Sequence, residues 1–512
     1  MEASGTISNM QREARLERRP RSIPDGLLYT MYVLTLAASL GIWFFNLRAP
    51  LWLDETVSIY LIRGGLAGIV SRQVWPDSPT YSCLLWLWTK VMGTGEVMLR
   101  VSSMLPMLAA VYALYHAARE LFGREVGLFT AIIFCLHPII IFASIDIRPY
   151  AFAALALNSA ILALVYLRHN DSNWLAALFG LSSAGIVQFQ LLFAAILPAL
   201  AVCFVVLKMD DRKTLWRQLR IALIVFAVGC LPVLPRLHYM VQTSGMHVFS
   251  EAPSLLELGS TLTHKGLAGI LIAAVLLAAA IQQVDWPSRQ DRWPALLCLS
   301  LALVPILTLF ALSVGTSVHV FVPRYRMASI PGIALCWGLA ASWIRLRALR
   351  LLVCIAVVVA TGYIYSTTPF LRQHQYSWKY ALDFVEKNAS TDNAPVLICS
   401  DIPEADHMRM PVGPAIEASG ILPPLSYYKL TVPVTPLPRA LNGETVRATS
   451  VFLEQEAPRH TRFLAMAFAQ SYDTLEWLSR NAGRDYSVHE LGQFDGVKVL
   501  EFSPHITGHL SR

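Results

Sequence analysis

The sequence predicts a polytopic α-helical membrane protein that ends in a small α/β domain. Of its 512 residues, 55% are hydrophobic and only 15% are charged, whereas a soluble globular protein averages about 25% charged residues. Apolar runs of about 20 residues, the length that crosses a bilayer as a helix, recur along the first 369 residues. These observations exclude a soluble multidomain enzyme.

The hydrophobic region, residues 28–369, follows a basic tail of residues 1–27 and contains eleven expected membrane spans. They cover residues 28–47, 99–118, 126–144, 150–167, 174–187, 190–207, 219–236, 266–283, 294–314, 327–344 and 350–367. The fifth and sixth are short, and they are either two spans or one long kinked helix. The count of eleven, rather than ten or twelve, depends on that choice.

The first outer loop, residues 48–98, contains a further apolar stretch at residues 81–92 that is too short to span a bilayer. Two of its residues are tryptophans, which are enriched at membrane interfaces. We therefore expect a re-entrant or interfacial helix rather than a further span.

The positions of the charges predict the orientation. The formal net charge is +7, but residues 370–512 carry 13 Lys and Arg against 16 Asp and Glu, while residues 1–369 carry 28 against 18. Of these 28 basic residues, 18 fall on one side of the expected spans. Cytoplasmic loops are rich in Lys and Arg, so we expect a cytoplasmic N-terminus and an extracytoplasmic C-terminus, with no nucleic-acid partner.

Residues 370–512 are expected to form the extracytoplasmic α/β domain. Helical patterns at Trp378–Asn388 and Tyr472–Asn481 alternate with strand-like runs at 395–399, 486–491 and 497–502. A Pro-rich stretch at 422–438 is expected to be a loop.

Acidic residues are scarce in the outer loops, and one adjacent pair stands out among them. The seven are Asp54, Glu55, Asp77, Glu96, Asp146, Glu251 and Glu257. Adjacent carboxylates at a membrane face raise each other's pKa, which suits one of Asp54 and Glu55 to act as a general base. The structural alternative is that Asp54 caps a helix beginning near Glu55, and both interpretations can hold together.

A second candidate motif, Asp146-Ile147-Arg148-Pro149-Tyr150, falls in the next outer loop and on the same face as Asp54. The planar fork of an arginine binds phosphate oxygens in pairs. The alternative is an interfacial anchor, in which the arginine snorkels and the tyrosine joins the aromatic belt.

A third candidate motif, Pro323-Arg324-Tyr325-Arg326, precedes the tenth expected span. This motif suits either specific binding of an anionic lipid headgroup or a general attraction to the headgroup region. Glu96 and Arg100 lie four residues apart, so the local expectation is an ion pair on one helix face. The histidines show no metal-binding spacing.

Taken in this order, the motifs resemble the GT-C glycosyltransferases that use lipid-phosphate sugars. The resemblance is to the bacterial branch related to protein O-mannosyltransferases and to aminoarabinose lipid A transferases. It rests on LWLDETVS (51–58), on residues 95–123 and 124–152, and on PRYRMASIPG (323–332). It runs along residues 28–345 and more weakly to the C-terminus, and it implies a GT-C fold in a bacterial plasma membrane.

The family resemblance implies an inverting transfer of a sugar from a polyprenyl-phosphate carrier to a hydroxyl of a glycan, lipid or protein acceptor. Asp54 would act as the base, with Glu55 beside it as the second catalytic residue. The positions that would bind the donor phosphate or substrate are Asp77, Asp146, Arg148, Tyr150, Arg324 and Tyr325.

Two positions depart from the family pattern. Many relatives have a His-Pro-Pro-Leu-Tyr-like sequence where this chain has Asp77-Ser-Pro-Thr-Tyr81. Because Asp77 stands in place of the imidazole, both metal binding and substrate choice are open, with a divalent ion as the candidate cofactor. Relatives also often have a Thr-His pair where this chain has Gln188-Phe189-Gln190, which points either to an unusual acceptor pocket or to a drift in specificity.

Two rival functions remain at this point. One is a ligase that moves a longer glycan from a lipid-pyrophosphate carrier. The other is a transporter or flippase of an amphiphile. Transporters tend to carry charges within their spans, whereas the expected spans here lack acids, so chemistry at the outer face is the favoured interpretation.

Overall fold

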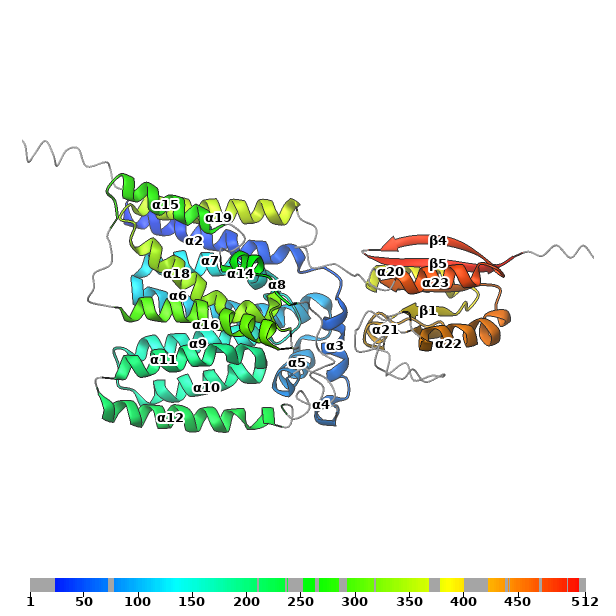
Figure 1. Ribbon diagram of the computed structural model, residues 1–512, viewed down its shortest axis with the longest axis horizontal. Helices are drawn as coiled ribbons and strands as arrows, with labels where there is room; N and C mark the ends of the chain where they lie inside the picture. The colour runs from blue at the N-terminus through cyan, green and yellow to red at the C-terminus, as the bar shows by residue number, and fades with distance from the viewer. Residues whose placement is uncertain are drawn as a thin grey trace, which may run out of the picture.

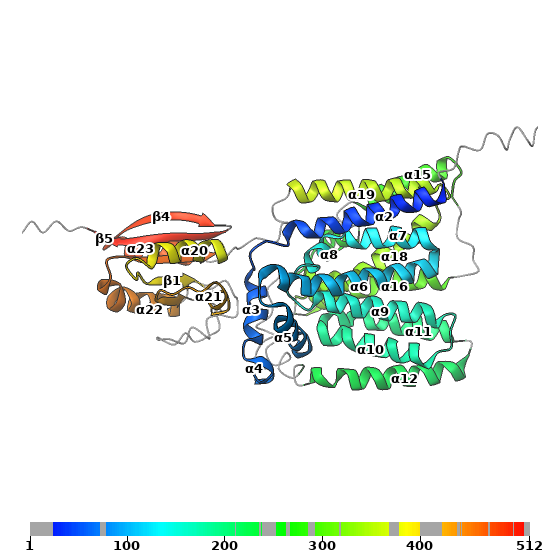
Figure 2. The same ribbon diagram turned by 180° about the vertical axis from the view of Figure 1, so that it is seen from behind.

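The computed structural model has two parts, a bundle of long helices and a smaller α/β domain at one end of it (Figure 1). It describes residues 24–71, 78–209, 211–234, 237, 252–262, 267–284, 292–316, 319–367, 378–399, 422–437, 441, 443–468, 472–494 and 496–505. Both views place the loop helices α3 (Leu53–Ile62), α4 (Gly65–Ser71) and α5 (Pro79–Met92) at the end of the bundle that faces the α/β domain (Figures 1 and 2).

All eleven expected spans are helical over most of their length. They correspond to α2 (Asp25–Gly41), α6 (Glu96–Phe122), α7 (Arg124–Cys135) with α8 (Pro138–Ala143), α9 (Tyr150–Leu167), α10 (Asn173–Phe189), α11 (Leu197–Lys208), α12 (Arg212–Cys230), α15 (Ala268–Ala280), α16 (Trp293–Gly315), α18 (Ile330–Ser342) and α19 (Arg347–Thr367). Among the described residues, seven helical segments are long and apolar enough to cross a membrane, and two shorter apolar helices accompany them. The protein is therefore an integral membrane protein, and the count of eleven stays a prediction.

Two of the expected spans have breaks that the structure locates. The third divides at His137, whose ring accepts a hydrogen bond from Ile139 N at 3.3 Å, with Pro138 opening the next helix. The fifth and sixth are separate helices, because α10 ends at Phe189 and Gln190 is extended, with φ −146° and ψ 103°. The alternative of one long kinked helix was wrong.

Small residues let the bundle helices approach closely, as is usual inside membranes. A Cβ added to Gly332 on α18 would lie 2.3 Å from the backbone of Leu301 and Ala302 on α16. A Cβ on Gly180 would lie 2.3 Å from the carbonyl oxygen of Ala222. Glycine is required at these two positions because no side chain fits between the helices.

Helix α5 has the length expected of a helix that does not span the membrane. Its 14 residues give a length of about 21 Å, shorter than the hydrocarbon core of about 30 Å. Leu84, Leu87 and Val91 are exposed at spacings of three and four, so they form one apolar stripe. This pattern is typical of a helix that lies at a membrane surface.

The C-terminal α/β domain is confirmed. Its five strands lie in the order β2-β1-β3-β5-β4, and they are β1 (Val396–Cys399), β2 (Val434–Leu437), β3 (Phe463–Phe468), β4 (Tyr486–Phe494) and β5 (Val497–Pro504). Strand β1 is parallel to β2 and β3, whereas β5 is antiparallel to β3 and β4. The helices are α20 (Trp378–Ala389), α21 (Leu422–Tyr428), α22 (Gly443–Val451) and α23 (Tyr472–Ala482).

The expectation of a loop at 422–438 was wrong in part, because this stretch contains α21 and β2. Pro423 and Pro424 fall in the first turn of α21, where a missing backbone N–H does no harm. Pro436 lies on β2, which is one of the two edge strands of the sheet, and edge strands tolerate proline. The prolines are thus compatible with regular structure at these positions.

Candidate active site

The site is built on the first turn of α3. The helix begins at Leu53, and the Glu55 carboxylate reaches back to accept a hydrogen bond from Trp52 N at 3.1 Å, as in a capping box. Asp54 is the second helical residue, so the expectation that Asp54 caps a helix beginning near Glu55 was wrong. Because Glu55 satisfies this backbone donor, the carboxylate of Asp54 is left for other partners.

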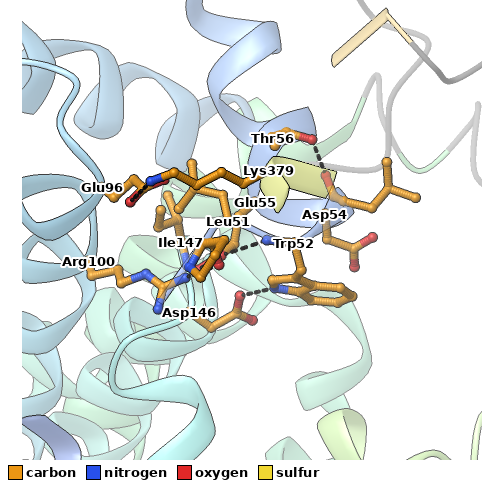
Figure 3. A network of polar contacts seen from close by, with 12 residues as sticks. Leu51, Trp52, Asp54, Glu55, Thr56, Glu96, Arg100, Asp146, Ile147 and Lys379 are labelled. Atoms are coloured by element: carbon orange, nitrogen blue, oxygen red, sulfur yellow. Dashed lines mark hydrogen bonds and ion pairs between the residues drawn. The ribbon is translucent and has the colours of Figure 1, made fainter. Parts of the chain in front are cut away.

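Glu55 is fully buried and is paired with Arg100 from α6. Arg100 Nη2 lies 2.8 Å from Glu55 Oε2 and also donates to the carbonyl oxygen of Pro50 at 2.9 Å. Ile147 N donates to the other Glu55 oxygen at 3.2 Å. Burial raises the pKa of the Glu55 carboxyl, while the Arg100 charge opposes that rise. Glu55 therefore joins the loop before α3, helix α6 and the segment before α9 (Figure 3).

The expected local ion pair between Glu96 and Arg100 does not form. Arg100 turns to Glu55, and Glu96 instead lies 3.3 Å from Lys379 Nζ on α20 of the C-terminal domain (Figure 3). The side chain of Glu96 is 19% exposed, whereas that of Glu55 is fully buried. Glu55 therefore needs a cation more than Glu96 does, because desolvation of an unpaired charge costs several kcal/mol.

Asp146 is the second buried acid of the cluster. Trp52 Nε1 donates to its Oδ1 at 3.0 Å, and Ser103 Oγ donates to its backbone carbonyl at 2.6 Å. Burial, with the nearby charge of Glu55, holds the pKa of Asp146 well above its ordinary value. Trp52 therefore bridges the Asp54 loop to the Asp146 motif, a role that the sequence pattern did not indicate.

Asp54 differs from both neighbours because 27% of its side chain is exposed. Its Oδ2 lies 3.4 Å from Arg324 Nη1, and Arg148 Nη1 lies 3.5 Å from its backbone carbonyl oxygen. Figure 3 shows its carboxylate pointing away from that of Glu55. The site thus has one accessible carboxylate beside two arginines.

The remaining predicted residues surround Arg324. Tyr150 is buried at the start of α9, and Tyr325 lies with its ring centroid 5.2 Å from Arg324 Cζ. Both tyrosines and Arg148 lie within electrostatic range of Arg324. The structure therefore brings the three predicted motifs together, while Asp77 lies outside the described residues.

Arg326 faces a different element from Arg324. Its Nη1 donates to Glu257 at 3.1 Å and to Thr261 at 2.6 Å on α14 (Leu255–Leu262). This contact fixes an outer-loop helix to the motif. Arg324 is therefore the arginine of this motif that faces Asp54.

No group of three or more His, Cys, Asp or Glu side chains that could hold a metal ion occurs among the residues described. A divalent cofactor stays an open prediction, and the chemistry of the site is derived below from the side chains alone.

The C-terminal domain also contacts the loop that carries Asp54. Tyr428 on α21 accepts a hydrogen bond from Leu51 N at 2.7 Å, and Leu53 belongs to the hydrophobic cluster of Trp378 and Leu425 in that domain. No sequence signal links these residues, because Leu51 and Tyr428 are 377 positions apart.

The fold has known counterparts. The solved structure of ArnT from Cupriavidus metallidurans, in the apo state and bound to undecaprenyl phosphate, matches with a TM-score of 0.55 and 14% identity over 92% of this chain and 97% of that chain. The chain has the GT-C glycosyltransferase fold. The fold that the resemblance implied is therefore confirmed.

Two further comparisons accompany this GT-C assignment. The family described as dolichyl-phosphate-mannose-protein mannosyltransferase matches residues 76–239. The Archaeoglobus fulgidus oligosaccharyltransferase, tethered to an acceptor peptide, matches with a TM-score of 0.47 and 11% identity over 91% of this chain and 69% of that chain. Among curated proteins, none matches.

Proposed function

We propose that this protein is an inverting glycosyltransferase that moves a sugar from a polyprenyl-phosphate carrier to an acceptor hydroxyl. One observation carries the proposal: Asp54 is partly exposed beside Arg324, whereas Glu55 and Asp146 are fully buried. A base must reach its substrate, and Asp54 meets that condition among the three clustered carboxylates. The GT-C fold supports the same class of reaction.

The proposed step balances with Asp54 as the proton acceptor. The acceptor hydroxyl transfers its proton to the Asp54 carboxylate while its oxygen forms a bond to the anomeric carbon. The bond from that carbon to the carrier phosphate oxygen breaks, and the electron pair leaves with the phosphate. Attack from the opposite side inverts the configuration, and Arg148 and Arg324 stabilise the charge that develops on the phosphate.

Glu55 is assigned a positioning role in this scheme. It holds Trp52 N and Ile147 N at the two sides of the site, so it fixes the distance between the base and the Asp146 motif. Misplacement of reacting groups by about 1 Å reduces rates by about 100-fold. Glu55 thus influences catalysis through the geometry of Asp54.

The carrier and location follow from two supporting observations. ArnT, which shares the fold, was solved with undecaprenyl phosphate. The excess of basic residues on one side of the bundle favours a cytoplasmic N-terminus. We place the reaction on the extracytoplasmic face of a bacterial plasma membrane, where the C-terminal domain would also lie.

The test uses purified full-length protein with polyprenyl-phosphate sugars and candidate acceptors. Asp54→Asn should lower kcat about 10²- to 10⁴-fold, because it removes general-base catalysis. Asp171→Asn is the matched control. Asp171 is an exposed loop residue outside the site, and its carboxylate pairs with Lys208. Full turnover by Asp54→Asn refutes the base assignment. Movement of the substrate across the membrane without bond cleavage refutes the proposal that the protein is an enzyme.

A further inference from the structure

A second site lies between the loop helices and the C-terminal domain. Here an interdomain cleft of about 810 Å³ is lined by Arg63, Trp86 and Lys90 on one side and by Lys379 and Lys429 on the other. This volume falls within the usual range of ligand pockets, about 300–1,000 Å³. Asp54 and Arg324 are not among its lining residues, so the cleft is separate from the candidate active site.

The interdomain cleft carries surplus positive charge. Among the described residues that line it, Glu96 is the only acid, and four are Lys or Arg. Glu96 is already engaged by Lys379 Nζ at 3.3 Å. The charges of Arg63, Lys90 and Lys429 therefore remain in excess, which favours an anionic ligand.

Three aromatic side chains line the same space: Trp86, Tyr427 and Tyr428. Tyr427 is held in place by a hydrogen bond from its hydroxyl to Thr94 O at 2.9 Å, and Lys90 Nζ lies 5.7 Å from the Trp86 ring centroid. Aromatic rings with a polar atom offer both a flat apolar face and a hydrogen bond. A ligand made of rings with hydroxyl groups, such as a saccharide, can pack against the apolar face and hydrogen-bond to the polar atom.

Lys429 occupies a strained position at the edge of the cleft. Its φ is +54° at the end of α21, with its N–H bonded to Leu425 O at 2.9 Å. Glycine is the usual residue there, because a side chain strains the backbone in this conformation. The lysine at this position nevertheless adds its positive charge to the lining of the cleft.

From these observations we propose that the interdomain cleft binds an anionic saccharide, a sugar chain bearing carboxylate or phosphate groups, as part of the acceptor. The proposal rests on the proposed function, because it names the substrate class of that reaction. Ile59 lines the cleft five residues beyond Asp54 along α3, a rise of about 8 Å. In the proposed arrangement, an acceptor of several sugar units fills the cleft and extends around α3 to present a hydroxyl at Asp54.

Binding without donor tests this proposal independently of turnover. The probes are a galacturonic acid tetramer and the neutral galactose tetramer of the same linkage, titrated into the full-length protein in nanodiscs. We expect the charged tetramer to bind at least tenfold more tightly and to weaken as salt rises. Lys90→Gln/Lys429→Gln should reduce its affinity about tenfold, whereas Lys387→Gln/Arg480→Gln, on α20 and α23 away from the cleft, should leave it unchanged.

Further arms separate the outcomes. Tighter binding of the tetramer when it is coupled to a lipid anchor assigns a membrane-borne acceptor, while equal binding of the free tetramer assigns a soluble or polymeric one. Equal affinity for the neutral tetramer, equal affinity for an acidic peptide of the same charge, or no effect of the double variant overturns the proposal. Asp54→Asn should bind the charged tetramer normally, so failure of the base assignment leaves this test intact.

Discussion

Removal of the Arg100 side chain tests the network that holds the Asp54 loop. Arg100 and Glu55 are fully buried with their charged atoms 2.8 Å apart. At an effective dielectric constant of about 20 their attraction is about 6 kcal/mol, much of which offsets the desolvation of two charges. Loss of one partner of a buried pair destabilises by about 3–5 kcal/mol, because the other charge remains. We expect Arg100→Leu to lose that amount of folding free energy.

The matched variant is Arg100→Leu/Glu55→Gln, which removes the stranded charge and keeps an amide oxygen for one backbone donor. It should be more stable than Arg100→Leu alone. It should also be slower than wild type in the proposed sugar transfer, because a glutamine at position 55 cannot accept hydrogen bonds from both Trp52 N and Ile147 N through two carboxylate oxygens. The assay measures the apparent Tm of each variant in detergent at one scan rate, with tryptophan fluorescence as the signal for unfolding. Equal Tm values for wild type and Arg100→Leu, or a double variant less stable than the single one, refute the reasoning.

The same variant has a distinct pH dependence. Burial already raises the pKa of Glu55 against the opposing effect of Arg100, so Arg100→Leu should raise this pKa further. A folded-state pKa above the unfolded one means that the folded protein holds the proton more tightly. The stability of Arg100→Leu should therefore recover below the ordinary pKa of glutamate and fall as pH rises through the folded pKa. A Tm difference from wild type that stays constant between about pH 4 and 8 contradicts this.

Two further predictions concern domain contact and helix packing. Tyr428→Phe removes the acceptor of the Leu51 N–H, so hydrogen–deuterium exchange at residues 50–56 should increase. The kcat should fall about fivefold, which corresponds to about 1 kcal/mol. Unchanged exchange at residues 50–56 contradicts a stabilising role for this contact. Gly332→Ala places a Cβ 2.3 Å from the Leu301 backbone, so it should destabilise by about 1–3 kcal/mol. Gly269→Ala, with open space around its added Cβ, is the control, and an equal Tm for both variants argues against tight packing.

The helical part of the fold was predictable because the bilayer imposes a length and a composition on each span. Strand β3 was missed, since its residues 463–467 are buried and the strand lies between β1 and β5. A buried strand of this kind lacks the alternation that marks an exposed one. The α/β character of the domain still emerged from its neighbouring helices and strands.

The residues of the candidate site were predictable from the sequence, but the hydrogen bonds and ion pairs between them were not. Asp54, Asp146 and Arg148 stood out because charges are rare on the outer side of a hydrophobic chain. The partner of Arg100 was mistaken, because the spacing rule for helices considers neighbours on one face and ignores a buried acid 45 residues away. Burial decided that choice, and burial is not visible in a local pattern.

The contact between the Asp54 loop and the C-terminal domain has a consequence for the biogenesis of the protein. Leu51 and Leu53 leave the ribosome early, whereas Leu425 and Tyr428, which hold them, follow more than 370 residues later. At about 5–20 residues per second, the loop waits roughly 20–75 s for these partners. A nascent chain that already spans the membrane therefore lacks the contacts that the C-terminal domain makes with the Asp54 loop until synthesis is nearly complete.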